Sequence, residues 1–178
     1  KNNSFIITNS KIPQHKKLKK IATKRKLKMI SLFNDKGIEI LDHNYIGEKQ
    51  SVSFAYQKKN YSFTTNLIGK IQITNLLMAS IAAQKSKIKF NKIVDNFQNM
   101  KPVNGRFEKI GNLKNKSLVI LDYAHTPDAL KVCLENIEDQ FSGRNIKIVF
   151  GCGGDRDKLK RSKMGTIAAK FCKKIYIT

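Results

Sequence analysis

Two loops in the second half of the sequence carry the residue types best suited to binding a ligand. The first, residues 122–128, reads DYAHTPD, so that a carboxylate, an aromatic ring and an imidazole follow one another closely. Its Thr-Pro-Asp end suits the N-cap, the first position and the positive end of a following helix. That leaves Asp122, Tyr123 and His125 as candidate ligand-binding residues, with packing inside the loop as the alternative.

The second loop, residues 151–157, reads GCGGDRD. Its three glycines permit close backbone approach and positive φ, and Arg156 offers a planar donor fork for a carboxylate or phosphate. The loop matches neither the GxxxxGK[ST] phosphate loop nor the GxGxxG dinucleotide pattern. The alternative is a tight turn in which Arg156 pairs with Asp155 or Asp157.

Both loops follow apolar runs in a chain segment that alternates strand and helix. The continuous apolar character of these runs is typical of strands buried on both faces of a parallel sheet. Ligands bind at the carboxyl ends of such strands, where both loops would lie. The expected βαβαβ order is strand 118–122, helix 127–137, strand 146–150, helix 161–173 and strand 174–178.

The first half of the chain reads as strands with one basic helix, followed by two packed helices. Alternating side chains predict a hairpin, and a change to helical spacing after Gly69 predicts a helix that ends near Lys87. A stop signal at Pro102 makes 102–105 the candidate domain linker. The other expected elements are strands 5–8, 28–33 and 37–41 around a turn at 34–36, hairpin 52–56 and 61–65 around a turn at 57–60, and helix 91–100.

The composition is strongly basic, with 35 Lys+Arg against 13 Asp+Glu and a formal net charge of +22. Such an excess fits an acidic partner such as nucleic acid or anionic lipid. Most of it is Lys spread from end to end, which favours compositional drift of a solvated surface. The dense run Lys11–Lys28 has no interleaved aromatic residues for base stacking and resembles a surface helix.

Other global features set further expectations. No apolar stretch approaches the length that spans a bilayer, and residues 1–4 lack a signal-peptide core, so a cytoplasmic protein without membrane insertion is expected. The spread of the lysines leads us to expect no nucleic-acid partner. The three cysteines have no CxxC spacing, which indicates neither a disulfide framework nor a zinc site. Both ends of the chain look cut.

The motifs NGRFE, LDYAHTPDAL, VFGCGGDRDKLKR and MG, in this order and at compatible spacings from Asn104 onward, resemble the Mur ligase family. Within the family they are most similar to the UDP-N-acetylmuramoyl-tripeptide synthetases, which add the third amino acid of the peptidoglycan stem. The helix 69–83 resembles the end of the family's central domain, and residues 1–67 resemble its β-rich half in pattern only.

The resemblance implies an α/β fold: residues 1–103 as the latter part of a central nucleotide-binding domain, and 104–178 as the first portion of a Rossmann-like C-terminal domain. It implies an ATP-dependent acid–amino-acid ligase of peptidoglycan synthesis, and so of cell shape and division. UDP-N-acetylmuramoyl-dipeptide and an amino acid would be its substrates. The family's phosphate loop and Mg²⁺ ligands belong to earlier positions than these, so the 178 residues alone are expected to be inactive.

The resemblance also implies roles for individual residues. Arg106 would contact the nucleotide from the hinge between the domains, and Asp122 would hydrogen-bond the ribose or nearby groups. Tyr123 and His125 would line the adenine side. Gln72 stands where the family usually has an Asn that approaches adenine, with the same amide on a longer arm.

Arg156 matches the family residue that helps to hold the incoming amino acid. The GGDRD form is associated with enzymes that add meso-diaminopimelate, and lysine is the alternative substrate. Two rival functions remain: a related ligase such as folylpolyglutamate synthase, and a basic nucleic-acid-binding module, which would bind with steep salt dependence.

Overall fold

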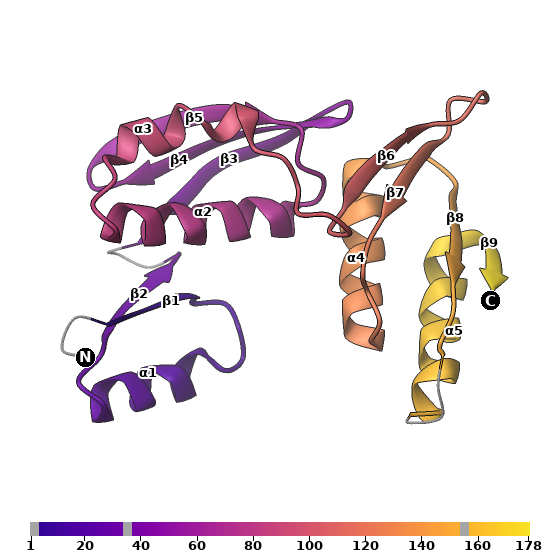
Figure 1. Ribbon diagram of the computed structural model, residues 1–178, viewed down its shortest axis with the longest axis horizontal. Helices are drawn as coiled ribbons and strands as arrows, with labels where there is room; N and C mark the ends of the chain where they lie inside the picture. The colour runs from indigo at the N-terminus through magenta and orange to yellow at the C-terminus, as the bar shows by residue number, and fades with distance from the viewer. Residues whose placement is uncertain (1–3, 34–36, 154–156) are drawn as a thin grey trace. The chain divides into compact units, whose positions relative to one another are not determined.

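The computed structural model describes residues 4–33, 37–153 and 157–178, which form two compact units (Figure 1). Unit 1 takes its residues from Lys1–Asn66 and Ile71–Met100, and unit 2 consists of Leu67–Lys70 together with Lys101–Thr178. The chain therefore enters unit 2 twice.

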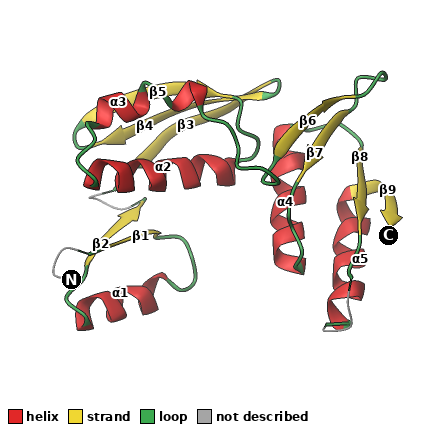
Figure 2. Ribbon diagram, viewed as in Figure 1, coloured by secondary structure: helices red, strands yellow, loops and turns green. Residues whose placement is uncertain are grey.

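Both units combine helices and strands, which confirms the α/β class (Figure 2). Unit 1 holds β1 (Phe5–Asn9), α1 (His15–Lys24), β2 (Lys28–Leu32), β3 (Glu39–Ile46), β4 (Lys49–Tyr56), β5 (Lys59–Thr65), α2 (Lys70–Lys85) from its second residue, α3 (Phe90–Val94) and a 3-10 turn (Phe97–Asn99). Unit 2 holds β6 (Glu108–Asn112), β7 (Leu118–Leu121), α4 (Pro127–Gln140), β8 (Ile146–Phe150), α5 (Leu159–Phe171) and β9 (Cys172–Ile177). No helix among the described residues is long and apolar enough to cross a membrane.

In unit 1 the basic helix α1 connects two parallel strands, β1 and β2. Its Ala22 is buried, and His15 Nε2 lies 2.8 Å from the Ser31 hydroxyl of β2. The two predicted strands around residues 34–36 join different sheets, because the helical crossover returns β2 alongside β1 while β3 pairs with β4. The turn predicted at 34–36 lies outside the described residues.

The predicted hairpin is present as β4 and β5, with Val52 opposite Phe63 and Phe54 opposite Tyr61. Its turn is tighter than expected. Gln57 and Lys58 both have positive φ, 50° and 62°, as a two-residue turn that follows the twist of the strands requires.

The core of unit 1 forms where α2 packs along the three-stranded antiparallel sheet of β3, β4 and β5 (Figure 2). Ile73, Leu77 and Ile81 recur at helical spacing and are fully buried, together with Phe54 of β4. The predicted helix 91–100, by contrast, is wrong in its continuity. α3 ends at Val94, and just beyond it the Asn96 side-chain amide donates to the Lys92 carbonyl at 2.8 Å, a local bond that competes with helix propagation.

Unit 2 contains two strand pairs of opposite kind. β8 and β9 are parallel and joined through α5, as predicted. β7 instead pairs antiparallel with β6, a strand that the sequence did not predict, so the expectation of one parallel run of three strands is wrong. Contrary to the prediction from sequence, β8 is also not buried on both faces, because its Val149 is 68% exposed.

The short segment Leu67–Lys70 is built into unit 2. Ile68 is 1% exposed in a cluster with Phe107, Cys133 and Phe141. The Gly69 N–H donates to the buried Gln140 Oε1 of α4 at 2.7 Å.

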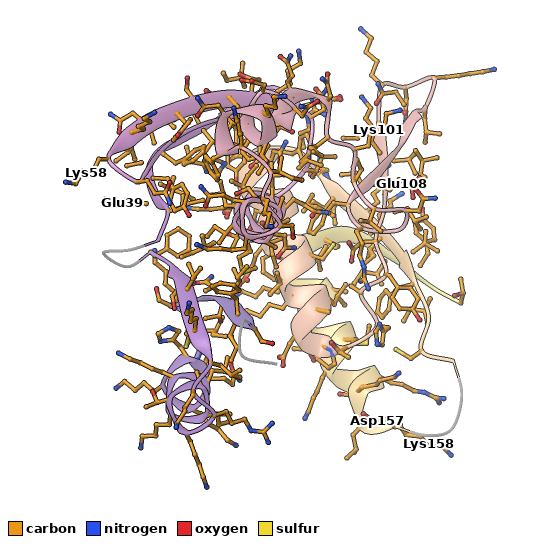
Figure 3. All side chains as sticks on the ribbon, turned by 60° about the vertical axis from the view of Figure 1, so that its left-hand side comes forward. Glu39, Lys58, Lys101, Glu108, Asp157 and Lys158 are labelled. Carbon is orange, nitrogen blue, oxygen red and sulfur yellow. The ribbon has the colours of Figure 1, made fainter. Side chains whose placement is uncertain are left out.

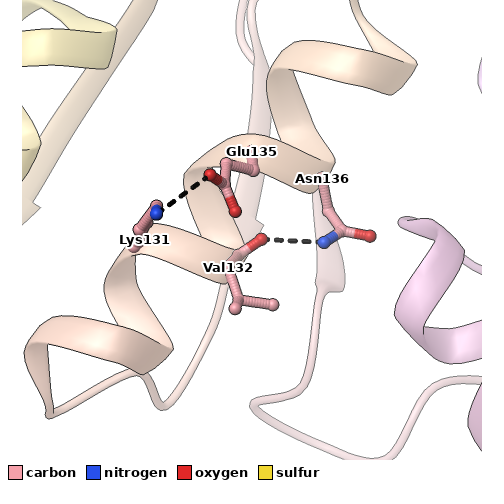
Figure 4. Close-up of polar contacts among 4 residues, drawn as sticks. All are labelled: Lys131, Val132, Glu135 and Asn136. Carbon is pink, nitrogen blue, oxygen red and sulfur yellow. Dashed lines mark hydrogen bonds and ion pairs between the residues drawn. The ribbon is translucent and has the colours of Figure 1, made fainter. Parts of the chain in front are cut away.

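Helix α4 constrains Gly69 sterically as well. Gly69 has a φ of +84°, and a Cβ at this position would lie 3.1 Å from Asn136, whose own amide donates to the Val132 carbonyl at 2.8 Å (Figure 4). On the same helix, Lys131 and Glu135 form an exposed ion pair at 3.7 Å. A glycine therefore suits position 69, because it adopts the positive φ without strain and has no Cβ to crowd Asn136.

We expect Gln140→Ala to lower the free energy of unfolding by about 1–3 kcal/mol, because the buried Gly69 N–H would lose this acceptor. Urea unfolding followed by circular dichroism measures the change. Glu138→Ala, an exposed neighbour on α4, is the control and should change stability by less than about 0.5 kcal/mol. Equal losses in the two variants would contradict the assigned role of Gln140.

A second expectation concerns Cys133. Burial above all, and then the charge of Asp122 and the neighbouring Cys172, raise the pKa of the Cys133 thiol from 9.0 to about 12. Above pH 9 the unfolded chain gives up this proton and the folded chain does not, so the free energy of unfolding falls as pH rises toward 12.

Between pH 8 and pH 10 the native chain should therefore lose about 1 kcal/mol more stability than Cys133→Ala. Urea titrations at the two pH values measure this difference, and the lysines that titrate in both proteins cancel from it. Parallel pH profiles for the two proteins would show that the buried thiol does not carry the effect.

Candidate functional site

The candidate site begins where β7 ends, in the loop that leads into α4. Thr126 caps the helix by accepting a hydrogen bond from the Ala129 N–H at 3.2 Å, and Pro127 occupies the first helical position, as predicted. The cap fixes the end of the loop. Asp122, Tyr123 and His125 then lie between a strand and a rigid helix start.

A second segment, the turn at residues 103–108, shapes the other side of the site. Gly105 and Phe107 both have positive φ, 68° and 48°. The Gly105 N–H donates to Glu108 Oε2 at 2.7 Å, and the Arg106 N–H donates to the Val103 carbonyl at 2.9 Å. Glu108, labelled in Figure 3, therefore closes this turn from the first residue of β6.

Two hydrogen bonds join the turn to the loop. Asp122 Oδ2 accepts from the Phe107 N–H at 3.0 Å, and the Tyr123 N–H donates to the Gly105 carbonyl at 2.8 Å. The second bond places Tyr123 next to the backbone from which Arg106 projects. Asp122 thus has a structural task, but a carboxylate has about four lone-pair sites, so one such bond leaves acceptor capacity.

Three of the predicted residues come together on the surface as a result. The Arg106 guanidinium lies 5.1 Å from the centroid of the Tyr123 ring, and the His125 ring lies 4.9 Å from the same ring at 54°. His125 Nδ1 is 3.0 Å from the Tyr123 carbonyl. Tyr123 is 64% exposed, so the group presents a cation, an aromatic face and an imidazole to solvent.

This arrangement combines two kinds of recognition. A guanidinium held over an aromatic ring is oriented for a phosphate or another planar anion, and the exposed ring can stack on a flat heterocycle. The Asp122 carboxylate, half-buried beside them, accepts hydrogen bonds of the kind that hydroxyl groups donate. The chemistry of the group fits a nucleotide.

The glycine loop after β8 is described only in part, and Arg156 lies outside the described residues, so its predicted role is not tested. A Cβ on Gly151 would meet the Thr178 carbonyl oxygen at 2.5 Å, which means that this glycine serves close packing of the chain against β9. Neither Gly151 nor Gly153 has positive φ. Asp157 accepts from the Lys160 N–H at 3.2 Å at the start of α5.

Gln72 lies in the first turn of α2 and is half-buried in unit 1, whereas Arg106, Asp122, Tyr123 and His125 all belong to unit 2. Its predicted contact with adenine stays a prediction. Among the described residues, no group of three His, Cys, Asp or Glu side chains could hold a metal ion.

Sequence reasoning missed two residues that shape the site, Glu108 and Phe107. Both belong to the NGRFE motif, which had pointed only to Arg106. The spacing of Gly105 and Glu108, with a carboxylate three residues after a glycine, is the signal that could have revealed the closed turn.

Comparison with protein families covers nearly the whole chain. Residues 1–83 match the Mur ligase middle domain, and residues 105–178 match the domain described as Mur ligase, glutamate ligase domain.

Curated proteins named UDP-N-acetylmuramoyl-L-alanyl-D-glutamate–2,6-diaminopimelate ligase are similar over the same span. The one from Rickettsia felis is 36% identical over 98% of this chain and 32% of its own length. The one from Oceanobacillus iheyensis is 44% identical over 63% of this chain and 22% of its own length. The chain thus spans about a third of the Rickettsia felis protein's length.

Solved structures match the fold. A UDP-N-acetylmuramoyl-L-alanyl-D-glutamate–2,6-diaminopimelate ligase gives a TM-score of 0.65 at 27% identity, covering 98% of this chain and 36% of that one. The folylpolyglutamate synthase of Thermotoga maritima gives a TM-score of 0.71 at 18% identity, covering 96% of this chain and 39% of that one, and shows the fold alone. With two domain models matched and relatives at this level of identity, the chain belongs to the Mur ligase family.

Proposed function

We propose that the chain is part of an ATP-dependent ligase that joins 2,6-diaminopimelate to UDP-N-acetylmuramoyl-dipeptide in peptidoglycan synthesis. The substrates come from the names of the relatives, which are 35–36% identical over nearly all of this chain. In this proposal residues 1–103 belong to the central domain and 104–178 to the C-terminal domain, in keeping with the spans of the two domain matches. A protein acting on such nucleotide-linked precursors would work in the cytoplasm.

The observation that carries the proposal is the surface group of Arg106, Tyr123 and His125 beside the Asp122 carboxylate. In ATP-dependent ligation, the substrate carboxylate takes the terminal phosphoryl group of ATP to give an acyl phosphate and ADP, and the amine of the amino acid then displaces phosphate to form the amide. The four residues would bind and orient the nucleotide: the guanidinium neutralises phosphate charge, the ring stacks on the base and the carboxylate accepts from ribose hydroxyls. Magnesium would be held by residues outside this group.

Arg156 is proposed to bind the carboxylate of the incoming amino acid through its donor fork. We propose diaminopimelate rather than lysine as this amino acid, because the similar curated proteins have diaminopimelate in their names. The rival folylpolyglutamate synthase function has only the shared fold in its favour, at 18% identity.

The first test concerns the Tyr123 ring in a protein that joins this chain to the further segments of its relatives. We expect Tyr123→Ala to raise the Michaelis constant for ATP by roughly three- to thirtyfold, because both the stacking surface and the support for Arg106 are lost. Tyr123→Phe keeps the ring and should stay near the native value.

Tyr176→Ala is the matched control, since Tyr176 is also exposed, at 51%, and also lies in unit 2. It should leave the constant for ATP unchanged. If Tyr123→Ala behaved like this control, the surface group would not be part of the nucleotide site.

The second test separates the amino-acid site from the nucleotide site. Arg156→Lys keeps the charge but loses the paired donors, so the Michaelis constant for diaminopimelate should rise roughly ten- to a hundredfold while that for ATP barely moves. Arg144→Lys, at an exposed position of unit 2, is the control.

The same assay tests the function itself. ADP should form only when both UDP-N-acetylmuramoyl-dipeptide and diaminopimelate are present. Turnover with folate and glutamate in their place would favour the rival ligase. A rise in the constant for ATP alone on Arg156→Lys would assign Arg156 to the nucleotide.

A further inference from the structure

The basic segment Lys11–Lys28, which contains α1, concentrates the positive charge of unit 1. Nine of the eighteen residues from Lys11 to Lys28 are Lys or Arg, and none is Asp or Glu. Two of these cations lie over aromatic rings, Lys11 over Phe33 at 4.6 Å and Lys28 over Phe5 at 5.8 Å. The other seven are all exposed: Lys16, Lys17, Lys19, Lys20, Lys24, Arg25 and Lys26.

The packing of α1 turns the cations of this helix outward. Ala22, which is 2% exposed, and His15, which bonds Ser31, lie on its buried side toward β1 and β2. Figure 3 shows long, nitrogen-tipped side chains extending away from this helix. The fold has covered the side of Ala22 and His15 and left a lysine face.

Nothing in the described part of the chain neutralises that face. None of the seven exposed cations forms an ion pair with a described carboxylate. Lys16 and Lys20, and then Lys20 and Lys24, stand one helical turn apart as like charges, a spacing that disfavours a helix. An external anionic surface would relieve this repulsion.

We propose that the exposed face of α1 docks on an anionic lipid surface, a role beyond ligation. Clusters of four to eight Lys or Arg on an amphipathic helix are typical of binding to acidic phospholipid headgroups. Ile21 lies 41% exposed among Lys17, Lys20 and Lys24, which places a short apolar side chain where it can enter the headgroup region. Nucleic acid fits less well, because α1 carries no Phe, Tyr or Trp for stacking and its one imidazole, that of His15, lies against Ser31 of β2.

The experiment uses the 178-residue chain and phosphatidylcholine vesicles with and without phosphatidylglycerol. Co-sedimentation should show binding only to the phosphatidylglycerol vesicles, weakening as salt rises. Changing Lys16, Lys17, Lys19 and Lys20 together to Gln should weaken binding roughly 600-fold, since each of the four cations near such a surface contributes about fivefold. Gln is also a good helix former, so α1 is retained, and a circular dichroism melt verifies the fold.

The matched control removes the same charge elsewhere, by changing the exposed Lys101, Lys114, Lys147 and Lys174 to Gln. We expect this variant to bind within about threefold of the native chain, because these cations lie outside the docking face. An equal loss in both variants would show that net charge alone drives binding and would overturn the proposal.

Duplex DNA separates lipid from nucleic acid. Ile21→Ala should weaken vesicle binding a few fold and leave DNA binding unchanged. Binding to DNA that is tighter than binding to phosphatidylglycerol vesicles near physiological salt would overturn the choice of a lipid surface.

Discussion

The hydrogen bond from the Phe107 N–H to the Asp122 carboxylate holds together the two segments on which the candidate site is built. The turn before β6 contains Phe107 with a positive φ of 48°, a conformation that a residue other than glycine keeps only when its surroundings over-determine it. Here the determinants are Asp122, the Glu108 carboxylate and the bond between Tyr123 and Gly105. With the turn fixed, the Arg106 guanidinium lies 5.1 Å from the centroid of the Tyr123 ring.

This arrangement reconciles two interpretations of Asp122 that the sequence leaves open. As a packing residue it satisfies a backbone N–H, and as a ligand residue it retains lone pairs toward solvent. The carboxylate also affects the interior, because its charge helps to keep the buried Cys133 thiol protonated. One side chain thus couples the shape of the turn, the electrostatics of the core and the surface offered to a nucleotide.

Much of the fold could be predicted from local pattern. Alternation in β4 and β5, helical spacing in α2 and the Thr-Pro cap of α4 depend on neighbouring residues, and all three are confirmed. β6 escaped prediction because its five residues, EKIGN, hold a single apolar side chain and a bulge between Lys109 and Gly111. The break after Val94 depends on one side-chain bond of Asn96 that no periodicity reveals.

The site was predictable to a different degree. Clustering of Asp122, Tyr123 and His125 follows from their closeness in sequence, whereas the approach of Arg106 required β6 to pair with β7. Gly151 illustrates the opposite error, because this glycine in a ligand-like loop is explained by the close approach of Thr178, the residue after β9. Residue type alone does not separate these two reasons for a glycine.

Because Leu67–Lys70 belongs to unit 2, this unit is not one contiguous piece of polypeptide. A protein engineer who excised it at Lys101 would remove Ile68 from between Phe107, Cys133 and Phe141 and leave an apolar hole. The cavity left by Ile68 would destabilise the isolated piece. A gene segment that encodes this unit must therefore include Leu67–Lys70 as well as the residues from Lys101 onward. Recombination between relatives would have to exchange these two segments together.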